Sequence, residues 1–130
     1  MAELKLEIVT PSRRLAETKC REVYVPGVRG EFGLLPEHAP LVSALSPGVV
    51  RYQEGNESKR LAIRSGFLQV NGDKVVLLAD EAVLPIEVKT TQLKTRRQEV
   101  EASMVSATVM PEERETLASE LVWLDAQLAL

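Results

Sequence analysis

Residues 30–51 read GEFGLLPEHAPLVSALSPGVVR, and this stretch decides how the chain on either side of it folds. Pro36, Pro40 and Pro47 each fix their own φ angle and push the preceding residue towards extended geometry, so a helix is excluded here. Gly30 supplies the backbone freedom that a tight turn needs. The stretch therefore predicts a stiff, surface-exposed elbow between short strands.

Strand-like segments lie on both sides of this elbow. Residues 4–8 alternate apolar and polar side chains, which is the period of a strand with one buried face. Comparable runs, each bounded by turn residues, occupy residues 15–18, 22–25, 32–35, 41–45, 49–52, 60–64, 67–70 and 75–79. Hairpin turns are predicted at residues 54–58 and at Asn71-Gly72. Many short strands at close intervals predict an antiparallel β-sandwich or barrel.

The chain changes character after Pro85, because glycine disappears from residue 88 onwards and helix-favouring residues dominate. The apolar face of a first predicted helix is formed by Leu93, Val100, Met104 and Ala107. A second helix is predicted to start at Pro111, and its apolar ridge is formed by Leu117, Leu121, Leu124 and Leu128. We therefore expect a β-sandwich domain over residues 1–86 and an antiparallel two-helix hairpin over residues 87–130.

Composition excludes several classes of protein. The net charge of −3 argues against a nucleic-acid partner, because phosphate binding needs a basic surface. The single cysteine, Cys20, rules out an intramolecular disulfide and is expected to act as a small apolar filler. The N-terminal residues lack the pattern of a signal peptide, and no stretch approaches the ~20 apolar residues of a spanning helix. We expect a soluble protein, or one that reaches a membrane only through partners.

Catalytic and metal-binding patterns are not found in the sequence. His38 is the only histidine, so a metal site would need carboxylates or Cys20 to complete it, and no spacing indicates such a cluster. Neither Ser43 nor Ser65 lies in a Gly-x-Ser-x-Gly elbow, which argues against nucleophilic catalysis. No glycine-rich loop followed by Lys-Ser or Lys-Thr is present. We therefore expect no cofactor and no catalytic residues. The alternative from another class is a small β-sandwich ligand-binding module or a cupin-like enzyme, with residues 31–38 facing the ligand.

The order GEFGLLPEHAPLV followed by SPGVVR resembles the epsilon subunit of the F-type ATP synthase, called delta in mitochondria. The resemblance continues through residues 64–70 (RSGFLQV) and 76–82 (VLLADEA). It implies a β-sandwich of about ten strands and a C-terminal helical hairpin. It also implies a non-catalytic rotor subunit that binds the gamma subunit and the c-ring and transiently meets the alpha and beta subunits. The implied location is the cytoplasmic face of the bacterial plasma membrane, or the equivalent face of a plastid membrane.

The resemblance also implies roles for particular residues. It predicts contact with the c-ring through the loop containing Glu31, Phe32, Pro36, Glu37 and His38.

Some family members bind ATP through an Ile/Leu-Asp-x-x-Arg-Ala motif at the start of the first helix. The matching positions here read VKTTQL, with Lys89 in place of the aspartate and Gln92 in place of the arginine. Because glutamine cannot replace a bidentate guanidinium, we expect weak or absent ATP binding.

In the family the hairpin can also inhibit ATP hydrolysis by contacting an acidic segment of the beta subunit. The first helix is basic, through Lys94, Arg96 and Arg97, whereas the second helix is predominantly acidic. Like charges at an interface repel. We therefore expect the hairpin to stay mostly folded down, and any inhibitory contact to be made by the basic first helix.

Overall fold

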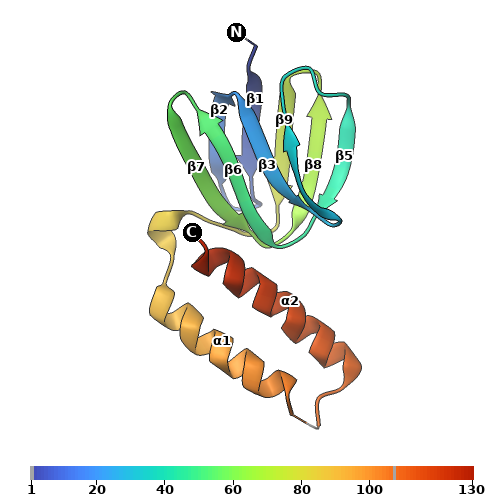
Figure 1. The fold of residues 1–130 in the computed structure, drawn as a ribbon, viewed down its shortest axis with the longest axis vertical. Helices are drawn as coiled ribbons and strands as arrows, with labels where there is room; N and C mark the ends of the chain where they lie inside the picture. Colours follow the sequence, from blue (N-terminus) through green and yellow to red (C-terminus); the bar gives the residue numbers. More distant parts are fainter. Residues whose placement is uncertain (1, 107) are drawn as a thin grey trace.

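The computed structural model describes residues 2–106 and 108–130, as a β-domain with a helical hairpin beneath it (Figure 1). The strands in the described residues are β1 (Leu4–Val9), β2 (Arg14–Cys20), β3 (Glu22–Gly27), β4 (Gly30–Leu34), β5 (Leu41–Leu45), β6 (Gly48–Glu54), β7 (Glu57–Ile63), β8 (Gly66–Asn71), β9 (Lys74–Ala79) and β10 (Ala82–Val83). A 3-10 turn, η1 (Pro85–Glu87), leads into α1 (Thr90–Met104) and α2 (Pro111–Leu128). The β-sandwich followed by a two-helix hairpin is confirmed.

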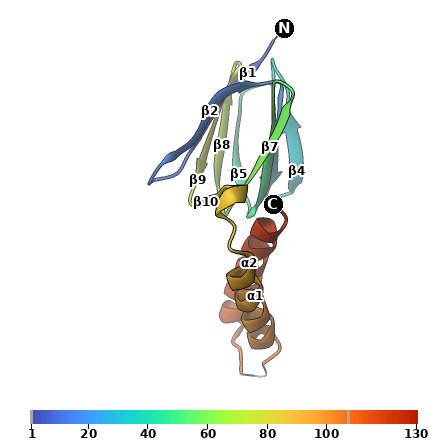
Figure 2. The ribbon, with the colours of Figure 1, turned by 90° about the vertical axis from the view of Figure 1, so that its left-hand side faces the viewer.

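The strands form two facing layers that are continuous at one corner (Figure 2). We call the layer with strand order β5-β8-β9-β1-β2 the outer layer; the other has the order β10-β7-β6-β3, with β4 beside β3. The layers join where Gly27 of β3 pairs with Leu45 of β5. The strand pairs are antiparallel except β1 with β9, which is parallel. The prediction of antiparallel pairing is wrong for this pair. A short hairpin would force the two strands to be antiparallel, but no hairpin joins β1 to β9.

The core lies between the two layers and follows the predicted alternation. Leu4, Leu6 and Ile8 of β1 are buried, and their polar neighbours along the strand point outwards. Full burial of such a side chain stabilises the fold by about 1.5–3 kcal/mol. Cys20 is also fully buried, and this burial raises the pKa of its thiol to about 11, so the thiol stays neutral. Its structural role as a filler agrees with the prediction.

The two hairpin turns differ from the prediction in different ways: the first is tighter, and the second is shifted by one residue. The turn between β6 and β7 contains only Gly55 and Asn56, because Glu54 already pairs with Glu57. The turn between β8 and β9 is Gly72-Asp73 rather than Asn71-Gly72, since Asn71 pairs with Lys74. Gly72 has a φ of +63°, a value that glycine adopts without strain, and this residue sets the position of the turn.

The hairpin docks on the sandwich through α2, by a face that the leucine ridge does not predict. Trp123 and Ala126 are buried against Ala62 of β7, whereas of the predicted ridge only Leu124 is buried. The other three ridge leucines are half-buried. In α1, Val100 is buried and Met104 is half-buried, while Ala107 lies outside the described residues. The ridge is therefore only part of the packing surface, and Trp123 attaches the hairpin to the β-domain.

Candidate partner-binding surfaces

The residues expected to form one c-ring loop lie in two different elements. Glu31 and Phe32 belong to strand β4, because Gly30–Leu34 pairs residue for residue with β3. Glu31 is exposed and accepts a bond from Arg51 Nη2 at 2.7 Å, while Phe32 packs partly against the core. The description of residues 31–38 as one loop is therefore wrong. Ladder bonds to β3 hold the first part extended, and only residues 35–40 form the elbow.

The elbow itself is short and held to a neighbouring turn. Pro36 and Glu37 form its tip, and Glu37 has a φ of +66°, which a non-glycine residue adopts at an energetic cost of about 1–2 kcal/mol. The backbone N–H of Glu37 donates to Asp73 Oδ1 in the β8–β9 turn at 3.1 Å. His38 Nδ1 donates to the carbonyl of Ala39 at 2.7 Å. The carboxylate of Glu37 is left facing solvent on a fixed backbone.

The five predicted contact residues thus follow one side of the sandwich from end to end. Glu31 is beside the β3–β4 turn, at the corner where Gly27 meets Leu45. Glu37 is beside Asp73, which immediately precedes β9 at the opposite end of the sandwich. A partner that contacts both Glu31 and Glu37 must therefore run along the β4 edge of the sandwich.

An exposed apolar surface on the outer layer is a feature that the sequence analysis did not identify. We call it the outer apolar face; it consists of Val9, Val42, Ala44, Phe67, Val76 and Leu78. Val42, Phe67 and Leu78 are 72%, 60% and 52% exposed. Strand register places them together, because Phe67 lies directly opposite both Ala44 and Leu78, and Leu78 lies opposite Val9. A contiguous apolar surface of this kind is a candidate site for a protein partner.

The sequence carried a signal for this surface. Residues 67–68 and 76–78 are runs of consecutive apolar residues rather than alternating ones. Such runs are typical of strands that are covered on both faces. In this structure the hairpin lies below the sandwich and leaves the outer layer uncovered (Figure 2).

The basic residues of α1 face the acidic residues of α2. Arg96 donates through Nε and Nη2 to the two carboxylate oxygens of Glu120, at 2.7 and 2.9 Å. Arg97 Nε donates to Asp125 Oδ1 at 2.6 Å. The hydrogen bond from Arg96 lowers the pKa of Glu120. The opposite charges of the two helices therefore join them to each other, whereas a hairpin that stays mostly folded down on the sandwich remains a prediction.

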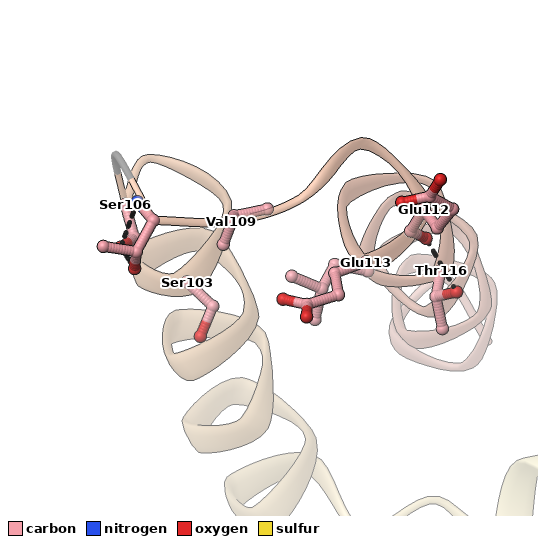
Figure 3. A pocket seen from close by; sticks show the side chains of 8 residues that line it. Ser103, Ser106, Val109, Glu112, Glu113 and Thr116 are labelled. Carbon is pink, nitrogen blue, oxygen red and sulfur yellow. Dashed lines mark hydrogen bonds between the residues drawn. The ribbon is translucent and has the colours of Figure 1, made fainter.

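A shallow groove lies between the adjoining ends of α1 and α2 (Figure 3). Ser103, Glu113 and Thr116 are among its lining residues. Across the described parts of the chain, no three histidine, cysteine or acidic side chains gather into a metal-binding group.

The family becomes clear from the β-domain. Residues 3–85 match the family model described as ATP synthase, Delta/Epsilon chain, beta-sandwich domain. The chain belongs to this family. The ligand-binding module or cupin-like enzyme is therefore not favoured.

Curated relatives extend the match to the epsilon family beyond the β-domain. An ATP synthase epsilon chain from Magnetococcus marinus is 37% identical over 124 residues, covering 95% of this chain and 90% of that one. An ATP synthase epsilon chain from Dehalococcoides mccartyi is 40% identical over 104 residues, covering 80% and 74%. The similarity to epsilon chains thus includes the helical hairpin.

Solved structures show the same fold. One similar chain lies in the mitochondrial ATP synthase of Euglena gracilis, described with OSCP, F1 and the c-ring; its TM-score is 0.87 at 22% identity, covering 99% of this chain and 81% of that one. Another lies in the central stalk and c-ring of the Tetrahymena thermophila enzyme, with a TM-score of 0.69 at 11% identity, covering 99% and 98%. The whole described fold, strands and helical hairpin together, is therefore shared with chains of two ATP synthase structures.

The positions matching the family's ATP motif lie where α1 begins. Lys89 precedes the first helical residue and Gln92 lies in the first turn, and both side chains are exposed. Neither brings the carboxylate or guanidinium of the motif to this turn. Weak or absent ATP binding remains a prediction for this member of the epsilon family.

Proposed function

We propose that this chain is a non-catalytic rotor subunit in the central stalk of an F-type ATP synthase. In this proposal it binds the gamma subunit through the outer apolar face. The observation that supports this most strongly is the exposure of Phe67 and Leu78, side by side, on a sandwich of the epsilon family. Covering a large apolar side chain stabilises a complex by roughly 1.5–3 kcal/mol before ordering costs.

The c-ring contact is proposed to follow the β4 edge. Its polar groups are Glu31 at one end and Glu37 with His38 at the other, with Phe32 and Pro36 between them. The elbow is suited to transmitting torque, because its prolines and the Glu37–Asp73 bond leave little backbone freedom to lose on binding. The structures with similar folds come from complexes described with a c-ring, which supports the setting of this proposal.

The proposed location is the cytoplasmic face of a bacterial plasma membrane, or the equivalent face of a plastid membrane, reached through the complex. The similar epsilon chains from Magnetococcus marinus and Dehalococcoides mccartyi support this setting. None of the helices in residues 2–106 and 108–130 has the length and apolar character needed to cross a bilayer.

The hairpin is proposed to regulate ATP hydrolysis by contact with the beta subunit. Lys94, Arg96 and Arg97 supply the basic groups for an acidic partner. In the folded-down state Arg96 and Arg97 are held by carboxylates of α2. A contact between these arginines and the beta subunit therefore requires those ion pairs to break first.

Binding to purified gamma subunit tests the proposed function. The variant Phe67→Asp places a charge in the centre of the outer apolar face and is expected to weaken binding at least about 100-fold. The control is Val122→Asp, a comparable change at an exposed apolar residue of α2, which should bind normally. Equal affinity of both variants and the unmodified protein would show that gamma docks elsewhere.

A further inference from the structure

Three lysines form a row across the outer layer. Lys5 of β1 lies directly opposite Lys19 of β2 on one side and directly opposite Lys74 of β9 on the other. All three are exposed on the face that points away from the core, since Leu4 and Leu6 of β1 point inwards. Like charges directly opposite each other destabilise a sheet. The lysine row, Lys5, Lys19 and Lys74, is therefore unfavourable in the isolated protein.

The adjacent row on the same strands shows how the fold neutralises such a repulsion. Glu7 lies opposite Glu17, and Arg14 donates to these two carboxylates at 3.3 and 2.7 Å. The lysine row has no such counter-ion: the ion pairs within the described residues include none of its three members. Asp73, which precedes Lys74, instead accepts the backbone N–H of Glu37. The positive charge is left open to a partner.

One row separates the lysine row from Val9 and Leu78 of the outer apolar face: Glu7 of β1, which lies opposite Val76 of β9 and opposite Glu17 of β2. Along the parallel pair of β1 and β9, Val9 lies opposite Leu78, and four residues earlier Lys5 lies opposite Lys74. Four residues of strand span about 13 Å, so one protein surface can cover both. A shallow groove lined by the three lysines, together with Glu7 and Glu17, runs over the row. A partner seated on the outer apolar face therefore reaches the lysine row.

We infer that the partner on this face presents acidic side chains to the lysine row, beside an apolar patch for the outer apolar face. This inference rests on the proposed function, in which that partner is the gamma subunit. An uncharged partner surface would cover three ammonium groups without replacing their water contacts, which is costly. Carboxylates on the partner remove that cost and the repulsion within the row. They also fix the orientation of docking and accelerate association.

Association kinetics of the full-length chain with purified gamma subunit test the inference. The variant carrying Lys5→Glu and Lys74→Glu should associate at least about ten-fold more slowly at low ionic strength. The difference should shrink at 1 M salt, where the Debye length is about 3 Å. The matched control carries Arg60→Glu and Arg114→Glu, which make the same change in net charge on β7 and α2. It should associate at the rate of the unmodified protein.

The outcomes separate the inference from the proposed function. If Phe67→Asp weakens gamma binding while the lysine variant behaves like its control, the inference is overturned and the proposed function stands. If neither changes binding, both are overturned. Vesicles containing anionic phospholipid are the third probe: a lysine variant that loses vesicle binding but binds gamma normally would assign the row to a lipid surface and overturn the inference. Thermal unfolding checks that each variant is folded.

Discussion

Arg13 and Glu87 lie 74 residues apart in the sequence and form a two-pronged ion pair, with both N···O distances at 2.7 Å. Arg13 also donates to the carbonyl of Ala82 at 3.2 Å, and Glu87 Oε1 accepts the backbone N–H of Leu84 at 2.9 Å. These bonds fasten η1 to the turn between β1 and β2. A movement of the hairpin relative to the sandwich therefore pivots after Glu87, where α1 has not yet begun.

The ion pair between Arg13 and Glu87 makes a pH-dependent contribution to the free energy of unfolding. The bonds from Arg13 and from the Leu84 backbone lower the pKa of Glu87 from 4.5 to about 2. Because the folded-state pKa is lowered, the contribution is complete above about pH 4.5 and is lost as the pH falls towards 2. Both side chains are more than a third exposed, so we expect less than about 1 kcal/mol.

The variant Arg13→Ala measures this contribution. At pH 7 residues 84–88 should exchange their amide hydrogens faster than in the unmodified protein, whereas Arg14→Ala should leave that segment unchanged. The difference in melting temperature between Arg13→Ala and the unmodified protein should shrink steeply as the pH falls from 4.5 towards 2. A difference that persists undiminished at pH 2 would mean that the ion pair is not its source.

Trp123 is predicted to hold the hairpin on the sandwich. It is 6% exposed and packs with Ala126 against Ala62. Trp123→Ala should weaken docking by about 3–5 kcal/mol, because truncating a buried tryptophan removes its contacts and leaves a cavity. Hydrogen exchange should then increase in α2 and at the surface of β7. The control Val122→Ala changes an exposed neighbour and should have an effect within about 0.5 kcal/mol; equal exchange in both variants would contradict the role of Trp123.

The ion pairs between α1 and α2 provide a way to identify which helix inhibits. Removing the arginines and removing their acidic partners should change ATP hydrolysis in opposite directions if α1 is the inhibitory helix. Replacing Arg96 and Arg97 by glutamate removes the basic groups and should raise ATP hydrolysis by the assembled complex. Replacing Glu120 by glutamine and Asp125 by asparagine breaks the same pairs but frees the arginines, so hydrolysis should fall. With exposed pairs worth about 0.2–1 kcal/mol each, breaking both pairs should change hydrolysis by roughly two- to thirty-fold.

Steady-state ATP hydrolysis by complexes reconstituted with each variant checks this prediction. Opposite changes in the two variants support inhibition by α1. If both variants raise hydrolysis equally, then folding of the hairpin, and not the charge of α1, controls inhibition.

ATP binding is predicted to be weak because Lys89 and Gln92 replace the acid and the guanidinium of the family motif. Titration calorimetry of the isolated chain should detect no binding with a Kd below about 1 mM, which corresponds to about −4 kcal/mol. GTP serves as the control for non-specific nucleotide binding. Saturable heat with ATP in the micromolar range, absent with GTP, would require a binding mode that does not use the motif.

The secondary structure could be predicted well wherever local patterns determine it. The alternation in residues 4–8 was sufficient to predict a strand, and the prolines of the elbow were sufficient to exclude a helix, because both effects act through neighbouring residues. The two-residue strand β10 has no such pattern, since it exists only by pairing with Ala62 and Ile63. The parallel pairing of β1 with β9 also depends on the whole fold and not on any turn.

The candidate sites were harder to predict because they depend on which faces remain uncovered. Glu31 was correctly expected to be exposed, but ladder bonds to β3 place it in a strand, away from Glu37. The sequence predicted that Phe67 lies in a strand. Its position opposite Leu78, which places both side chains on one surface, follows only from the strand register. The lysine row likewise joins three separate strands.

The central claim is that gamma docks on the outer apolar face. The most direct measurement introduces a photo-crosslinking amino acid at position 67 of the chain in the assembled, active ATP synthase and identifies the crosslinked partner by mass spectrometry. Our account predicts a crosslink to the gamma subunit from position 67 and none from position 122 on α2. Failure to crosslink gamma from position 67, combined with a gamma crosslink from position 122, would contradict it.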